Sequence, residues 1–189
     1  EDLVIANTEA LSSTDATSGV SLAFTHALAQ VNFSAKGEDA LTYELTKVEI
    51  QGVANNGTYS FDNTWQVTGT TGNYIYPIGE SPVKIANSET KALDQVDGAL
   101  MLLPQTFEVG SSAKIVVNYT VKDASGDVIY TATNKEVKLA STTSWQIGKK
   151  IRYTLTLTND AKTISFGTPS ITPWSESDDN KEDQTVPKG

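Results

Sequence analysis

The stretch KIVVNYTVK, residues 114–122, alternates apolar and polar side chains with a period of two. The stretch KIRYTLTLT, residues 150–158, repeats the pattern with Ile, Tyr and Leu opposite Arg and Thr. Successive side chains of a strand point to opposite faces, so both stretches are predicted to be strands with one face in a core and one in water. Half-buried strands of this kind are typical of antiparallel sheets.

Turn sequences between further short apolar runs extend this pattern along the chain. Asn56-Gly57 suits a type I′ hairpin turn, and DASGD, residues 123–127, suits a longer glycine-containing loop. No stretch keeps a 3.6-residue apolar period, and the one helical turn we expect lies within Thr90–Val96. The sequence therefore predicts an all-β fold, an antiparallel β-sandwich.

Composition divides the chain into three parts. Residues 1–18 hold an isolated first strand and a polar linker, which we interpret as the remnant of a preceding domain. Residues 19–174 form the predicted sandwich domain, with a long surface loop over residues 79–98. Residues 175–189 are an acidic, flexible tail, because they carry too little apolar surface to order themselves.

Charge and composition exclude several classes of protein. The 189 residues carry a net charge of −9, which argues against binding to nucleic acid or to an anionic membrane surface. There is no cysteine, so disulfides, thiolate metal sites and a cysteine nucleophile are excluded. No run approaches the ~20 apolar residues of a transmembrane helix. The chain begins at Glu1 and its one methionine is Met101, so we expect a processed or trimmed chain whose export signal has been removed.

His26 is the single histidine and the first candidate for chemistry. It could be a general base, a metal ligand or a structural ring, but its neighbours offer no acid or nucleophile to pair with. We expect a structural ring, hydrogen-bonded to a nearby carbonyl or side chain, in a strand that changes register between Leu28 and Val31. Carboxylates are plentiful, but they lie mainly in turns and on polar faces, where they are solvated. Nothing in the sequence indicates that two of them form the catalytic pair of a glycosidase. We expect no enzyme activity, no catalytic residue, no metal and no cofactor.

Aromatic residues around a Gly- and Thr-rich turn suggest a second kind of site. Exposed aromatic rings can stack against saccharides, although such rings also pack into sandwich cores with their polar tip at the rim. The candidates for a ligand platform are Tyr59, Trp65, Tyr74 and Tyr76. A carbohydrate-binding surface module is therefore kept as an alternative function.

Four segments, in order, resemble the fimbrillin family of Bacteroides-type bacteria. VSLAFTHALAQVNFSAKG (20–37) is similar to its F-x-H-A-L-x-x-V-x-F segment, and DLVIA (2–6) to the strand that precedes it. ALMLLPQTF (99–107) resembles an apolar run ending in Pro-Gln. SWQIGKKIRYTLTLTNDAKTISFGTPSITPW (144–174) is similar to the W-x-x-G-K-x-Y-x-Y-x-L strand pair that closes on Ile-x-x-Trp.

The resemblance implies a fold, a location and partners. It implies Greek-key, transthyretin-like sandwiches in a two-domain pilin precursor that is exported as a lipoprotein, of which this chain supplies the C-terminal domain. The lipid anchor, the only membrane contact, is then lost on maturation. The protein would be an extracellular, cell-surface subunit of a fimbrium at the outer membrane, in its stalk or at its tip. Its partners would be other fimbrial subunits and a host or bacterial surface protein or glycan.

The resemblance also implies a mechanism of assembly. A pilin that lacks one strand leaves a groove and an unpaired edge, which a strand of the neighbouring subunit fills. In the family the donor comes from the C-terminal region. Here residues 163–174 have the apolar content to pair, and the donor candidates are Ile164, Phe166, Ile171 and Trp174. Alternatively, this subunit donates no strand and lies at an end of the fibre.

Overall fold

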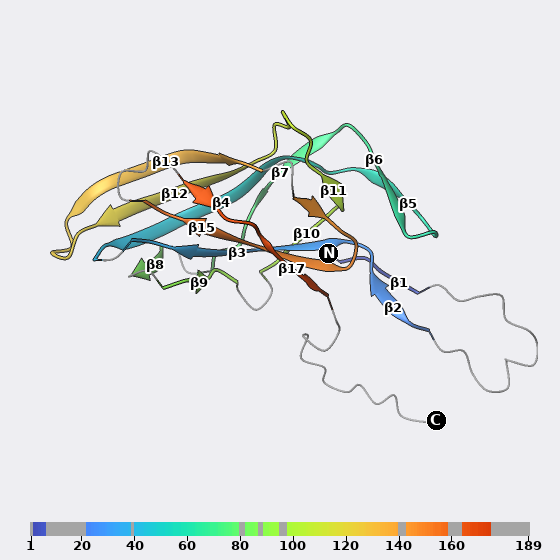
Figure 1. Cartoon of the computed structure of the whole chain (residues 1–189), viewed down its shortest axis with the longest axis horizontal. Helices are drawn as coiled ribbons and strands as arrows, with labels where there is room; N and C mark the ends of the chain where they lie inside the picture. Colours follow the sequence, from blue (N-terminus) through green and yellow to red (C-terminus); the bar gives the residue numbers. More distant parts are fainter. Residues whose placement is uncertain are drawn as a thin grey trace, which may run out of the picture.

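The computed structural model describes residues 2–6, 22–38, 40–79, 82–86, 89–94, 98–139, 143–158 and 164–174. In these ranges the regular structure is all strand, and no helix there is long and apolar enough to cross a membrane. Two main sheets run roughly along the long axis of the molecule and pack face to face (Figure 1). The predicted all-β sandwich is confirmed.

The first sheet is built around a pair of long central strands, β3 and β15. Strands β10 and β9 pair with successive parts of β3 on one side, and β17 and β16 pair with successive parts of β15 on the other. The β3–β15 pair is parallel, with Ile151 opposite Val31, whereas every other pairing in this sheet is antiparallel. The bounds are β3 (Ala29–Lys36), β9 (Lys91–Ala92), β10 (Leu100–Leu102), β15 (Lys149–Thr156), β16 (Ser165–Phe166) and β17 (Ser170–Pro173).

The second sheet is antiparallel and has β12 and β4 at its centre. Strand β13 pairs with β12 at one edge, and β7 and β8 pair with the two halves of β4 at the other. The bounds are β4 (Thr42–Ala54), β7 (Thr71–Ile75), β8 (Val83–Ala86), β12 (Lys114–Lys122) and β13 (Val128–Lys138).

Three two-stranded pairs complete the fold. The bounds are β1 (Val4–Ala6) with β2 (Phe24–His26), β5 (Gly57–Ser60) with β6 (Thr64–Val67), and β11 (Gln105–Thr106) with β14 (Ser144–Trp145). Strands β1, β2, β5 and β6 lie at one end of the molecule, opposite the end that carries the loop between β12 and β13 (Figure 1). The side chain of Gln105, in β11, accepts a hydrogen bond from the Ala54 backbone amide at 2.9 Å, so it holds the end of β4.

The inward faces of both sheets form one hydrophobic core. Phe33 of β3 is fully buried and meets Tyr76 edge-on, with ring centroids 5.0 Å apart, and Tyr153 at 5.8 Å. The two stretches with period-two alternation supply one central strand of each sheet, β12 and β15, and the residues predicted to face inward are all buried. Alternation along the sequence therefore locates the core.

Two bulges in β4 explain why its buried residues change parity. Tyr43 and Leu45 face the core, but after Thr46 the buried positions are Val48 and Ile50. A second register shift lies at Gly52, whose φ of 72° is easily reached only without a side chain. Each bulge lets a 13-residue strand twist while its apolar side chains stay in the core.

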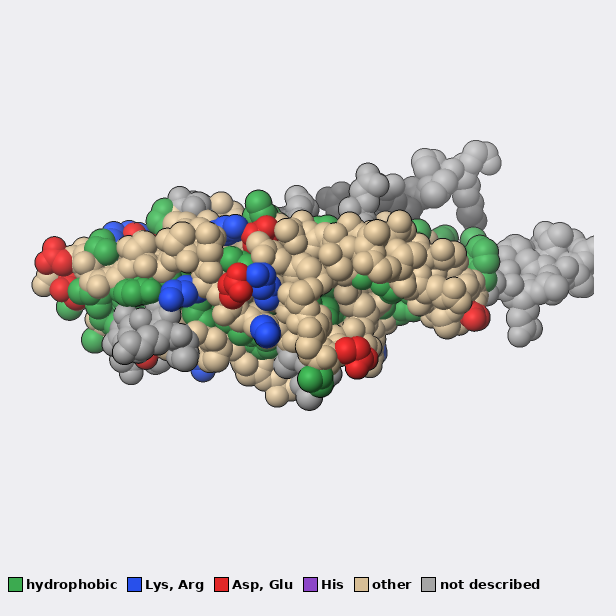
Figure 2. All heavy atoms as spheres, turned by 90° about the horizontal axis from the view of Figure 1, so that it is seen from above, with side chains coloured by type: hydrophobic (Ala, Val, Ile, Leu, Met, Phe, Trp, Pro, Cys, Tyr) green, Lys and Arg blue, Asp and Glu red, His purple; other side chains and the backbone are tan. Residues whose placement is uncertain are grey.

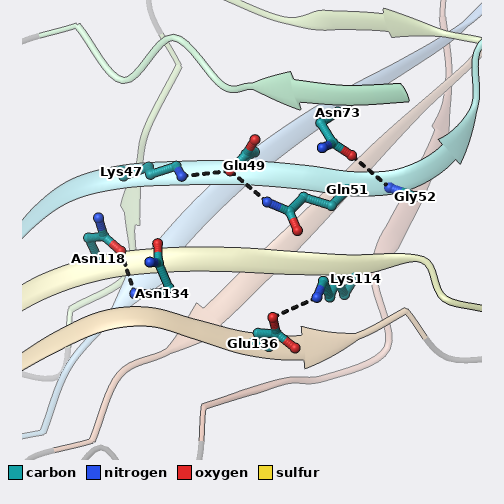
Figure 3. Close-up of polar contacts among 9 residues, drawn as sticks. All are labelled: Lys47, Glu49, Gln51, Gly52, Asn73, Lys114, Asn118, Asn134 and Glu136. Atoms are coloured by element: carbon teal, nitrogen blue, oxygen red, sulfur yellow. Dashed lines mark hydrogen bonds and ion pairs between the residues drawn. The ribbon is translucent and has the colours of Figure 1, made fainter. Parts of the chain in front are cut away.

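The outer face of the second sheet carries pairs of opposite charges rather than a continuous charged patch. Glu49 lies 2.6 Å from Lys47 and accepts a hydrogen bond from Gln51, and Lys114 pairs with Glu136 across β12 and β13 (Figure 3). The Lys47 ammonium group lowers the pKa of Glu49. From above, acidic and basic side chains again lie side by side near the middle of the molecule (Figure 2).

Three local predictions are wrong. Residues within Thr90–Val96 form strand β9 rather than a helical turn, and the predicted surface loop over 79–98 supplies β8, whose Val83 and Ile85 are buried in the core. Asn56-Gly57 makes no type I′ turn, because neither residue has the positive φ that this turn requires. The polar linker that was predicted to end at residue 18 and the tail, residues 175–189, lie outside the described residues.

Candidate functional site

The outer edge of β15 is covered by the C-terminal end of the described chain. Strand β16 forms only two pairs with β15, Phe166 opposite Leu155 and Ser165 opposite Thr156. Strand β17 forms four pairs, from Ser170 to Pro173, and all four of its residues are exposed. Two short, separate strands therefore occupy an edge along which one longer strand could pair.

The structure places all four donor candidates against their own domain. Ile164 and Phe166 are partly buried against the core, and the Phe166 ring meets Tyr153 edge-on at 5.1 Å. Ile171 lies opposite Ile151 but remains 45% exposed, and Trp174 follows at the end of β17. The segment thus has a buried anchor at its start and an exposed strand at its end.

Trp174 is held by the one histidine. The rings of His26 and Trp174 stack face to face, with centroids 3.6 Å apart and an interplanar angle of 4°. His26 Nδ1 lies 2.6 Å from the Asp2 carboxylate, just before β1. This contact joins the N-terminal strand, β2 and the C-terminal strand, and we call it the Asp2–His26–Trp174 clasp.

The prediction that the His26 ring is hydrogen-bonded to a nearby group is confirmed by its contact with Asp2, but the expected register change is wrong. Phe24 is 51% exposed, because β2 leaves the sandwich and pairs with β1 instead of continuing β3 with a bulge. His26 Nε2 and Trp174 Nε1 are buried without a hydrogen-bond partner in the described part of the chain. Burying an unpaired polar group costs about 1–3 kcal/mol, so the clasp is less stable than its ring stacking alone suggests.

The four predicted platform residues do not form one surface. The prediction is wrong for Tyr76, which is 1% exposed because its ring completes the core and its hydroxyl donates a 2.8 Å hydrogen bond to Asp94. Tyr74 packs partly against the core from β7. Tyr59 and Trp65 do meet, edge-on at 5.3 Å, in the β5–β6 hairpin. Only these two rings remain as neighbouring candidates.

A polar network beside β9 holds the edge of the first sheet. Arg152 of β15 reaches across β3 and donates hydrogen bonds to the Phe33 carbonyl and the Ser34 hydroxyl, at 3.2 Å each. Its two terminal guanidinium nitrogens also pair with the Asp94 carboxylate. Hydrogen bonding to Asp94 raises the pKa of Arg152, and burial raises that of Tyr76. These shifts come from structural contacts that the sequence did not reveal, because Asp94 and Arg152 are 58 positions apart.

The β13 edge of the second sheet differs from the β15 edge. Opposite Asn118 it bulges, where Asn134 has a φ of 49° and donates its backbone amide to the Asn118 side chain at 2.7 Å (Figure 3). Lys135 and Lys138 follow on the same strand. Bulges and lysines on an edge strand discourage pairing with another chain.

In the described part of the chain, no group of three or more His, Asp or Glu residues is arranged to hold a metal ion. Two features of the described residues are candidates for binding a partner: the β15 edge with its short C-terminal strands, and the aromatic hairpin β5–β6.

Comparison with known proteins identifies relatives of the sequence and of the fold. The sequence model of the family described as Fimbrillin-like matches residues 1–174. No curated protein matched the chain.

Among solved structures, a fimbrial protein from Bacteroides vulgatus superimposes with a TM-score of 0.62 and 20% sequence identity, over 82% of this chain and 56% of that protein. A candidate cell adhesion protein from Bacteroides uniformis gives a TM-score of 0.48 and 18% identity, over 82% of this chain and 54% of that protein. The chain thus spans little more than half the length of these proteins, and the first of them shares its fold.

Proposed function

Because the chain belongs to the Fimbrillin-like family, we propose that it is a non-catalytic subunit of a cell-surface fimbria, in the stalk or at the tip. The subunit assembles by strand addition and contributes to adhesion. Its partners are then other fimbrial subunits, and it acts outside the cell, having reached the outer membrane on a lipid anchor that maturation removes.

The observation that supports this mechanism is that only short, largely exposed strands cover the β15 edge. Residues 164–174 pair with this edge in their own domain, but β17 is exposed at all four positions and β16 is only two residues long. Edge strands with few buried contacts open at low free-energy cost. We assign the donor role to this segment, which leaves its own β15 and pairs with β15 of a neighbouring subunit.

The register provides the specificity of this exchange. Ile171 lies opposite Ile151 and Phe166 opposite Leu155, so two of the four donor candidates pair with buried residues of β15. Main-chain hydrogen bonds would supply affinity, and these side chains would fix the register. The bulged, lysine-bearing β13 edge offers no equivalent template.

A labelled peptide with the sequence of residues 163–174 tests the exchange. We expect the peptide to bind the Trp174→Ala variant faster than the unaltered chain, because loss of the stacking with His26 frees the β15 edge. Fluorescence anisotropy measures the binding, and a melting curve checks that the variant is folded.

The matched control is the same peptide with Phe166 and Ile171 both replaced by Asp, which keeps its length but not its apolar side chains. Equal binding of the two peptides, or no binding of the first peptide to either protein, would count against strand addition at this edge.

A further inference from the structure

A groove of about 580 Å³ lies between the β5–β6 hairpin and the β11–β14 pair. Trp65 and Val67 of β6 form one wall, and Thr106, Ser144 and Gln146 line the opposite side. Trp65 is partly exposed and Gln146 is exposed, so both are accessible from solvent. The groove thus combines an aromatic ring with hydroxyl and amide groups.

The Trp65 ring is held in a fixed orientation. Its Nε1 donates a 2.7 Å hydrogen bond to the Ala27 carbonyl, in the turn between β2 and β3. The Tyr59 ring also packs against it, edge-on, with the ring centroids 5.3 Å apart. A ring fixed in this way presents an apolar surface to a ligand with little loss of conformational entropy on binding.

The groove carries no charge. None of its nine lining residues is ionisable, although 20% of the residues in the chain are charged. A charged ligand would lose its hydration here without gaining an opposite charge, which is costly. The lining therefore favours a neutral ligand that offers hydroxyl groups to the amides and an apolar face to the tryptophan.

A second hollow of about 440 Å³ lies next to this groove and shares the lining residue Ile147 with it. Phe24, His26, Asn63 and Trp174 are among the residues that line the second hollow. It again combines aromatic rings with an amide, and it adds the imidazole of His26. Two neighbouring hollows that each carry an aromatic ring suit a chain of similar units better than a single small molecule.

We propose that this groove binds a neutral oligosaccharide, with Trp65 stacking against one sugar ring and the Gln146 amide hydrogen-bonding to its hydroxyls. This site differs from the platform predicted from the sequence, since it keeps Trp65 but uses neither Tyr74 nor Tyr76. Binding of a saccharide in this groove does not require strand exchange at the β15 edge.

An array of neutral and acidic oligosaccharides, followed by calorimetry on the full chain with the strongest neutral binder, tests the proposal. Trp65→Ala should weaken that binding at least about tenfold through loss of stacking. Gln146→Ala, at an exposed position that leaves the fold intact, should weaken it by roughly two- to tenfold.

Phe61→Ala is the matched control, because Phe61 is an aromatic residue in the same hairpin, 75% exposed and outside the groove lining. Its binding should equal that of the unaltered chain. Binding that is absent, that is confined to acidic saccharides or apolar peptides, or that survives both Trp65→Ala and Gln146→Ala would overturn the proposal.

Discussion

Replacing Trp145 with alanine is expected to lower the free energy of unfolding by about 3–5 kcal/mol. The side chain is 2% exposed and meets Phe107 edge-on at 4.9 Å. Its Nε1 donates a 2.9 Å hydrogen bond to the hydroxyl of Tyr153, another fully buried side chain. The substitution therefore leaves a cavity and also removes a buried hydrogen bond.

Urea unfolding followed by circular dichroism measures this change. Phe61→Ala provides the comparison, because it removes an aromatic ring, smaller than the indole, that is 75% exposed, and it should change the stability by less than about 1 kcal/mol. Similar losses in the two variants would show that Trp145 does not anchor the core.

Stability is also expected to fall steeply when the pH rises above about 10. Burial raises the pKa of Tyr119 to about 12 and that of Tyr153 to about 12, from ordinary values near 10. Between these values each of the two tyrosines keeps its proton in the folded protein and releases it in the unfolded chain, so alkali favours unfolding. Each tyrosine then accounts for a loss of about 2–3 kcal/mol, which is complete only above pH 12.

Urea midpoints measured from neutral pH to about pH 12 follow this loss. Tyr153→Phe keeps the ring but removes one titrating hydroxyl, so its stability should fall less steeply above pH 10. A variant whose stability falls as steeply as that of the unaltered chain would mean that Tyr153 ionises normally in the folded state.

The core could be predicted from the sequence because strand alternation is a local property. In β15 the buried residues are every second one, and β12 departs from this alternation only at Val116, which is buried as well. In β4 the parity changes twice, and the reason for the first change lies across the sheet, where Thr46 bonds to the Asn118 carbonyl. Residues 79–98 were predicted to be a loop, yet β8 contributes to the core because it pairs with β4.

The site was harder to predict because its contacts join distant residues. The sequence indicated that His26 was structural, since no catalytic partner lay nearby, but not that it stacks on Trp174, 148 positions away. The platform prediction used proximity in sequence, and it failed for Tyr76 because that ring, directly after β7, is buried in the core. The groove beside Trp65 is formed by segments around residues 65, 105 and 145, which no local pattern brings together.

Strand exchange at the β15 edge is tested most directly by locking β17 to β15. Lys150 and Thr172 are directly opposite each other, at a Cα separation of roughly 4.5–5.5 Å that a disulfide can span. Because the chain has no cysteine, Lys150→Cys with Thr172→Cys introduces a single, unambiguous bond. The control pair, Thr120→Cys with Thr131→Cys, locks β12 to β13 and leaves β17 free.

Native mass spectrometry of the concentrated protein then shows which species form. We predict that the oxidised Lys150–Thr172 variant remains monomeric, while its reduced form and the oxidised control assemble into oligomers. Oligomers formed equally well by the oxidised Lys150–Thr172 variant would contradict assembly through release of residues 164–174.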